Sequence, residues 1–365
     1  MNEVAGGCTG LGMSSIPISE QTVERSQNPG KEDVKMKKIL LMVGLVLVSF
    51  SLAQAADFPT KDFSGIIQWG AGGATDNVVR ATNPWVEKHL GKQIVLQNKP
   101  GATGAVAVQW VHNQPSDGYT ILFGAENPLL YRVLDISQLE YKDFYPVNII
   151  ARNAGVIVCN IDQPWKSMKD LFEDAKKNPG QIKMGSTGAG GLPHVAESMF
   201  KALDGVTFND IPFGGEGPSM VAMQGGHVQF TTVGLAAGRE HIRAGRIRAL
   251  AVLGSEPVPG LENVPALTSL YPAYKKYFPW GPFYGAFVKR DVSEEAKKKL
   301  VDAYQKGTKE AKFQDFLKDF GVVYMGIYGD EADKFLNHWQ SVTTWLLQDA
   351  GATKVSPEKF GIPKP

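Results

Sequence analysis

The sequence predicts an α/β fold built from two lobes. Strand-like and helix-like segments alternate along most of the chain, which is typical of α/β folds with largely parallel sheets. The length of 365 residues is enough for two domains of ordinary size. Two glycine-rich turns, at 70–76 and 185–194, each follow a short strand-like run and open a helical pattern. We therefore expect two lobes, each with a mainly parallel sheet flanked by helices, joined by two crossing strands.

Patterns of apolar residues place the individual elements. Strands are predicted at 66–69, 94–96, 119–123, 147–150, 156–158, 181–184, 206–211, 228–232, 248–253 and 285–288. Helices are predicted at 75–90, 106–112, 167–177, 193–203, 218–224, 293–306, 311–320 and 331–349. Gly91 ends the first helix, and Pro84 is expected to kink or split it.

Two segments are expected to cross between the lobes, 151–154 and 285–288. They divide the chain into a first part of lobe 1 (56–152), lobe 2 (153–280) and a return segment of lobe 1 with the C-terminal helices (281–365).

The first 55 residues resemble a mis-assigned start followed by a secretory signal. Met36-Lys37-Lys38 precedes an apolar run, 39–52, and Ala53-Gln54-Ala55 supplies a small-x-small cleavage pattern. The alternative is an uncleaved membrane anchor, although the apolar run is shorter than the roughly twenty residues that a transmembrane helix needs. We expect residues 1–35 to be a non-native extension, 36–55 to be the signal, and the exported chain to begin near Ala56. Cys159 is then the only cysteine of that chain, and it is expected to be a buried thiol.

The turn at 70–76 is a candidate seat for a carboxylate. Glycines allow a tight turn and a close approach of the backbone, and the first N–H groups of a helix have no partner inside it. Thr75 or Asp76 is expected to cap the helix, with Asp76 a brace of the loop rather than a ligand contact. The predicted contacts here are Trp69, Gly72, Gly73, Ala74 and Thr75. Trp69 is expected either to pack against an apolar part of the ligand or to fill the core of its lobe.

The turn at 185–194 is the candidate opposing seat, with Ser186, Thr187, Gly188 and His194 as contacts. A nucleotide loop is disfavoured because its Gly-Lys-Ser/Thr ending is absent. His194 and Glu197 are spaced to share a helix face, so a metal pair is the weaker alternative.

Other residues have both a binding and a structural interpretation. Gly214 and Thr232 are expected either to bring backbone donors to the cleft or to lie in glycine-rich connecting loops. Glu126 is expected either to face an amine or hydroxyl group of the ligand or to lie in solvent. Arg152 and Arg239 are counter-charges for a carboxylate or surface and hinge arginines. The net charge of +1 gives no general attraction to nucleic acid or to an anionic membrane.

Taken in order, several segments resemble one family. These are Gly72-Gly73-Ala74-Thr75-Asp76, the segments 91–104, 115–124, 178–180, 185–188 and 241–252, Asn263-Val264-Pro265, and Gln348-Asp349-Ala350-Gly351. The chain resembles the substrate-binding receptors of tripartite tricarboxylate transporters, the Bug-type receptors. The sequence departs from the common pattern of this family at 69–71, 126–128 and 190–193. These are expected cleft positions, so the differences bear on which substrate is bound.

The resemblance implies a two-lobed periplasmic-binding-protein fold of the type II kind. It implies a small organic acid as ligand, whether a di- or tricarboxylate, an aromatic acid or an acidic amino acid, held between lobes that close by a hinge motion. It also implies membrane transporter subunits as partners, a monomer, no cofactor and no catalysis. One alternative is a sensor that passes its ligand signal to a membrane kinase. The other is an exported hydrolase, against which the sequence shows no Gly-x-Ser-x-Gly elbow, no His-Glu-x-x-His and no cysteine cluster.

Overall fold

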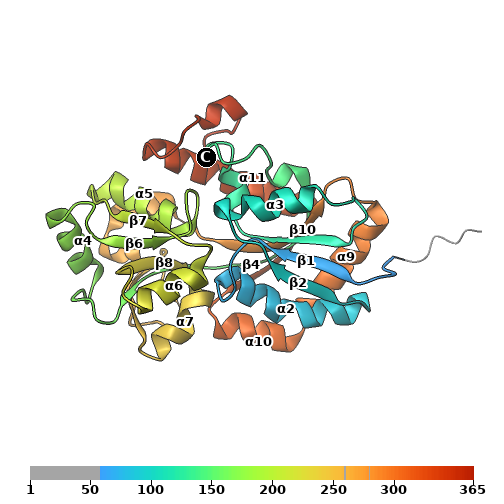
Figure 1. Ribbon diagram of the computed structural model, residues 1–365, viewed down its shortest axis with the longest axis horizontal. Coiled ribbons are helices and arrows are strands. Elements are labelled where there is room, and N and C mark those ends of the chain that lie inside the picture. Colours follow the sequence, from blue (N-terminus) through green and yellow to red (C-terminus); the bar gives the residue numbers. More distant parts are fainter. Residues whose placement is uncertain (1–57, 259, 279) are drawn as a thin grey trace, which may run out of the picture. The chain divides into compact units, whose positions relative to one another are not determined.

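The computed structural model describes residues 58–258, 260–278 and 280–365 (Figure 1). Contacts group residues 56–365 into one compact unit. The predicted extension and secretory signal, residues 1–55, lie outside the described residues. Within the described ranges, no helix is both long enough and apolar enough to cross a membrane.

Two mixed sheets form the framework. The first has the order β11-β4-β10-β3-β1-β2, and the second β7-β6-β8-β5-β9. The strands of the first are β1 (Phe63–Ile67), β2 (Ile94–Asn98), β3 (Thr120–Gly124), β4 (Phe144–Arg152), β10 (Phe283–Lys289) and β11 (Val323–Ile327). Those of the second are β5 (Gly155–Asn160), β6 (Lys183–Ser186), β7 (Asn209–Pro212), β8 (Phe230–Gly234) and β9 (Ile247–Leu253).

The expectation of mainly parallel sheets was wrong in one respect. β1 is parallel to β2 and β3, and β6 is parallel to β7 and β8, but β10 runs antiparallel to β3 and β4. β5 likewise runs antiparallel to β8 and β9. The reason is the connectivity. β4 carries the chain out of the first sheet and β10 brings it back, so two neighbouring strands must run in opposite directions.

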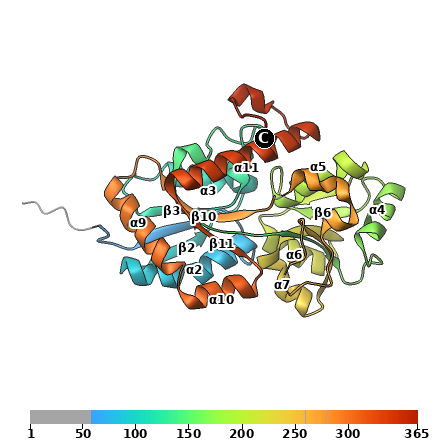
Figure 2. The ribbon, with the colours of Figure 1, turned by 180° about the vertical axis from the view of Figure 1, so that it is seen from behind.

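Helices cover both faces of each sheet. On the first sheet, α3 (Ala105–His112) and α11 (Gly329–Asp349) cover one face, and α2 (Ala74–Leu90) and α10 (Ala311–Asp319) cover the other, with α9 (Glu294–Gly307) packed on α2 (Figures 1 and 2). On the second, α5 (Leu192–Asp204) lies opposite α6 (Glu216–Gln224) and α7 (Leu235–Arg243). The remaining α-helices are α4 (Met168–Lys177) and α8 (Leu267–Leu270).

The core consists of two apolar clusters, one for each side of the sheets. Alternate residues of a strand point to opposite faces, so Ile66 joins the cluster under α3 and α11, while Ile67 joins the cluster under α2 and α9. Both clusters contain residues from both sheets, and Cys159 is buried in the first, as expected. The two sheets therefore share continuous packing rather than two isolated cores.

Most predicted elements are present, and the exceptions are informative. Gly91 ends α2 in the left-handed conformation at φ 67°, and the Ser167 hydroxyl caps α4. The expected split at Pro84 was wrong, because α2 continues through it. The expected side-chain cap of α2 was also wrong, because its N-cap is Gly73, without a side-chain hydrogen bond. Sequence patterns missed α7, α8 and β11.

The two segments that connect the sheets lie against each other. The second one precedes β10, whereas the predicted crossing at 285–288 lies within β10 of the first sheet. Between β4 and β5, the Asn153 N–H donates to the Pro282 carbonyl at 2.9 Å, just before β10 begins. Next to it, a Cβ atom at Gly281 would lie 2.3 Å from the Asn153 carbonyl oxygen. Only glycine allows this approach of the two backbones, so Gly281 fixes the spacing of the crossing strands.

We predict that Gly281→Ala destabilises the protein, because the added methyl group must push the crossing strands apart. Forced overpacking of this kind costs about 1–3 kcal/mol of unfolding free energy. Gly254→Ala is the matched control, since its Cβ would make only an ordinary contact at 3.4 Å with Val252. Urea denaturation of both variants measures the difference, and equal stabilities would contradict the tight spacing.

Candidate functional site

A small pocket lies where loops of the two sheets meet. It is lined by Trp69, Gly73, Ala74, Thr75, Ala125, Glu126, Thr187, Leu192, Glu216, Pro282 and Tyr284. The residues after β1 and β3 come from the first sheet, and those after β6 come from the second. In open α/β sheets, ligands bind outside the carboxyl ends of the strands, which is where these loops lie. The cavity of about 20 Å³ has room for about one water molecule.

Helices around this pocket begin without a side-chain cap. The N-caps of α2, α5, α6 and α7 are all glycines, namely Gly73, Gly191, Gly215 and Gly234, and none has a side-chain cap hydrogen bond. By contrast, serine hydroxyls cap α4 and α9. Unsatisfied N–H groups and the positive ends of the helix dipoles favour an anion. The region is therefore built to receive negative charge.

The carboxylate of Glu216 already uses two of these helix starts. Its Oε2 accepts a hydrogen bond from the Ala74 N–H at 2.9 Å, and its Oε1 accepts one from the Gly234 N–H at 2.7 Å. Burial raises the pKa of Glu216, whereas these two hydrogen bonds lower it. Because Ala74 belongs to α2 of the first sheet and Gly234 to β8 of the second, this carboxylate joins the two halves of the pocket.

Glu216 was missed by the sequence reasoning, which considered Gly214 to Gly217 only for backbone donors. A signal was present: an acid stands between Gly215 and Gly217 at the start of a helix.

Glu126 is the second acid of the pocket, and it is poorly satisfied. The residue is only 3% exposed, and its Oε2 has no hydrogen-bond partner among the residues that the structure describes. Burial raises the pKa of this carboxyl to about 8, and the nearby charge of Glu216 acts in the same direction. Among the described residues that line the pocket there is no lysine, arginine or histidine. An acid is thus kept in an apolar site without a counter-charge.

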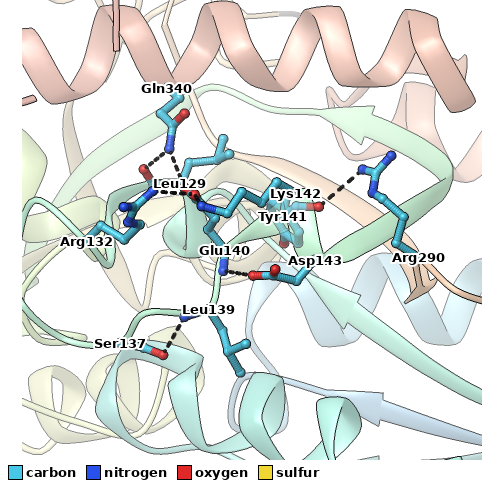
Figure 3. A network of polar contacts seen from close by, with 10 residues as sticks. All are labelled: Leu129, Arg132, Ser137, Leu139, Glu140, Tyr141, Lys142, Asp143, Arg290 and Gln340. Atoms are coloured by element: carbon cyan, nitrogen blue, oxygen red, sulfur yellow. Dashed lines mark hydrogen bonds and ion pairs between the residues drawn. The ribbon is translucent and has the colours of Figure 1, made fainter. Parts of the chain in front are cut away.

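Side chains hold the backbone on either side of Glu126, and Figure 3 shows the part of this polar network around Leu129 and Glu140. The Tyr141 hydroxyl donates to the Ala125 carbonyl at 2.5 Å, and the Gln340 amide of α11 donates to the Leu129 carbonyl at 2.9 Å. Glu140 is the centre of the network and accepts hydrogen bonds from Gln340, Arg132 and Lys142. Tyr141 and Gln340 therefore hold the backbone at Ala125 and Leu129, on either side of Glu126.

Half of the twelve predicted contacts line this pocket. These are Trp69, Gly73, Ala74, Thr75, Glu126 and Thr187, whereas Gly72, Ser186, Gly188, His194, Gly214 and Thr232 do not line it. The first six come from three different loops, so the fold brings together residues that the sequence places far apart. Whether they contact a ligand stays a prediction.

Several of the other six support the loops instead. The Ser186 hydroxyl accepts a hydrogen bond from the Gly188 N–H at 2.9 Å, and His194 Nδ1 accepts one from the Gly190 N–H at 3.1 Å. The Gly214 carbonyl accepts one from the Gly70 N–H at 2.9 Å, which connects the two glycine-rich loops.

Asp76 is a loop brace, as expected, because its Oδ2 accepts a hydrogen bond from the Gly72 N–H at 3.0 Å. Glu197 accepts one from the Phe208 N–H, and the described residues contain no group of three or more side chains suited to a metal ion. Arg152 lines a different cavity, and Arg239 is buried and does not line this pocket.

We predict that Glu126→Gln stabilises the protein at pH 8 and flattens the pH dependence of its stability. In the unfolded chain this carboxyl loses its proton near pH 4.5, but in the folded protein it keeps the proton up to about pH 8. The folded state therefore binds more protons in this window, and stability falls as the pH rises, by up to about 1.4 kcal/mol per pH unit. Chemical denaturation from pH 4 to pH 8.5 measures this slope.

Glu295→Gln, at an exposed position on α9, is the control and should keep the wild-type slope. If Glu126→Gln keeps it as well, Glu126 is not the group responsible.

The fold and this pocket define a class: a two-lobed binding protein of the α/β type. The sequence matches the family described as the tripartite tricarboxylate transporter family receptor (TctC) over residues 78–349. The chain belongs to this receptor family.

Relatives support the assignment. BugT of Bordetella pertussis is 29% identical over 249 residues, which cover 66% of this chain and 76% of BugT. A protein encoded in the gbd 5′ region of Cupriavidus necator is 29% identical over 315 residues, or 86% of this chain and 91% of that protein. The solved structure of the periplasmic binding protein BugD is 26% identical, with a TM-score of 0.75 over 81% of this chain and 99% of BugD. The matched family is described as a receptor, and BugD is described as a periplasmic binding protein.

Proposed function

We propose that this protein is a periplasmic receptor that captures a small organic carboxylate in the pocket and delivers it to a tripartite tricarboxylate-type membrane transporter. One observation carries the proposal: the pocket already holds a carboxylate, that of Glu216, on the N–H groups of Ala74 and Gly234. This arrangement supports a region that favours negative charge; because Glu216 occupies these two N–H groups, the carboxylate of a ligand uses other donors of the pocket. Membership of the receptor family supports the transporter partner and the periplasmic location.

Thr75 and Thr187 line the pocket from segments that follow strands of different sheets, and we propose that their hydroxyl groups face the ligand. Both are hydrogen-bond donors suited to a carboxylate oxygen. A ligand that contacts Thr75 and Thr187 together interacts with both halves of the site only when they are close. It therefore stabilises the closed arrangement by its differential affinity for it.

Binding requires the pocket to enlarge. A cavity of about 20 Å³ admits a water molecule but not an organic acid. The crossing segments at Asn153 and Gly281 are the natural hinge, since they join the two sheets. We propose that 56–152 with 281–365 forms one lobe and 153–280 the other, and that these lobes move as two bodies.

A thermal-shift screen tests the proposal. Dicarboxylates, tricarboxylates, aromatic acids and amino acids are added in turn to the purified protein, with neutral sugars as controls. A ligand that binds only the folded state adds about 2.7 kcal/mol of stability at a hundredfold excess over its Kd. A screen in which only compounds without a carboxylate raise the Tm would contradict the proposal.

We predict that Thr75→Val weakens the binding of the carboxylate found in that screen. Loss of one hydrogen bond costs about 0.5–1.5 kcal/mol, and more when the acceptor is charged. Thr82→Val is the matched control on the same helix, because the Thr82 hydroxyl donates to the Val78 carbonyl and lies outside the pocket. Titration calorimetry compares the two variants, and an unchanged affinity for Thr75→Val would remove Thr75 from the site.

A further inference from the structure

The acidic residues of the pocket make it a poor site for a dianion. Glu126 and Glu216 both line it, and the described lining residues include no basic side chain. Glu216 is satisfied by two N–H groups, but Oε2 of Glu126 has no partner among the described residues although the residue is 3% exposed. A buried carboxyl oxygen without a donor is costly, so the site lacks a hydrogen-bond donor at this point.

We propose that the ligand supplies this donor as an ammonium group, so that the receptor takes amino monocarboxylic acids and disfavours dicarboxylates. This inference rests on the proposed carboxylate-receptor function and specifies its substrate class. The ligand's carboxylate lies against the Thr75 and Thr187 hydroxyls, and its ammonium group lies against Glu126.

Charge is the reason for an amine rather than a second acid. A dicarboxylate would place its second carboxylate in the pocket beside Glu126 and Glu216, with no basic lining residue to neutralise it. The Glu216 carboxylate would repel it in this poorly solvated site, whereas an ammonium group would favour the ionised form of Glu126. The structural relatives Rpa4515 and MatC of Rhodopseudomonas palustris were solved with adipate and malate, so this specificity would set the present chain apart from them.

The other walls also suit an ammonium group. Trp69 and Tyr284 line the same pocket, and aromatic faces attract cations. An ammonium group has three donors, enough for Glu126 and a neighbouring acceptor, whereas a hydroxyl has one donor and brings no charge. A charge-assisted hydrogen bond to a carboxylate is about twice as strong as a neutral one.

Matched ligand sets test the proposal by titration calorimetry on the purified protein. Each set keeps the carbon skeleton and changes one end: an amino monocarboxylate, a hydroxy monocarboxylate, the plain monocarboxylate, the dicarboxylate, and the amine without a carboxylate. Skeletons of three to six carbons and a benzene ring cover the range of lengths. The amino monocarboxylate of the best skeleton should bind about ten- to a hundredfold more tightly than its dicarboxylate and plain counterparts.

Variants then connect this preference to Glu126. Glu126→Gln keeps the shape but removes the acid, and it should lower the preference for the amine at least about tenfold while leaving the plain monocarboxylate within about threefold. Glu197→Gln is the matched control, because Glu197 is a half-buried acid whose pKa is also raised but which lies outside the pocket. It should leave the ranking unchanged.

The outcomes separate the two proposals. If dicarboxylates bind most tightly, or if Glu126→Gln keeps the preference for the amine, the ammonium inference is overturned and the carboxylate receptor stands. If no acid binds, or if the amine without a carboxylate binds as tightly as the amino acid, the proposed function itself fails. Circular dichroism of each variant confirms that a lost preference is not a loss of fold.

Discussion

The pocket depends on one interaction: the Glu216 carboxylate between the Ala74 and Gly234 N–H groups. It satisfies two donors that have no partner within their own helices and that belong to different sheets. Without it, both N–H groups would be buried next to each other in an apolar pocket, at a cost of about 1–3 kcal/mol each. The same interaction therefore joins the two sheets at the pocket and places a carboxylate there.

The electrostatic potential of the pocket depends on which residues cap the N-termini of the helices around it. Serine hydroxyls cap α4 and α9, whereas α2, α5, α6 and α7 begin at glycines that provide no side-chain cap. The acids Glu126 and Glu216 partly offset this positive potential. The charge of the ligand that the pocket favours therefore depends on two opposing contributions, the helix dipoles and the carboxyl groups of Glu126 and Glu216.

Local patterns predicted most elements and the turn that opens α2, because periodicity and glycine positions are encoded over a few residues. They did not predict that β10 runs antiparallel to β3 and β4, since strand direction depends on where the chain returns. Glu216 escaped notice for a similar reason: Ala74, one of its two partners, is 142 positions away in the sequence. The sequence predicted which amino-acid types lie near the pocket, but not that Glu216 would pair with Ala74 and Gly234.

Backbone amides have a consequence for how such a receptor diversifies. Substitution cannot remove an N–H group unless proline is introduced, so the donors at Gly73, Ala74 and Gly234 persist while side chains around them drift. Under the proposed specificity, exchanging Glu126 for a neutral residue would change the preferred ligand, whereas exchanging Glu216 would also leave the Ala74 and Gly234 N–H groups without their partner. A single codon at position 126 could therefore change the ligand while the backbone donors remain.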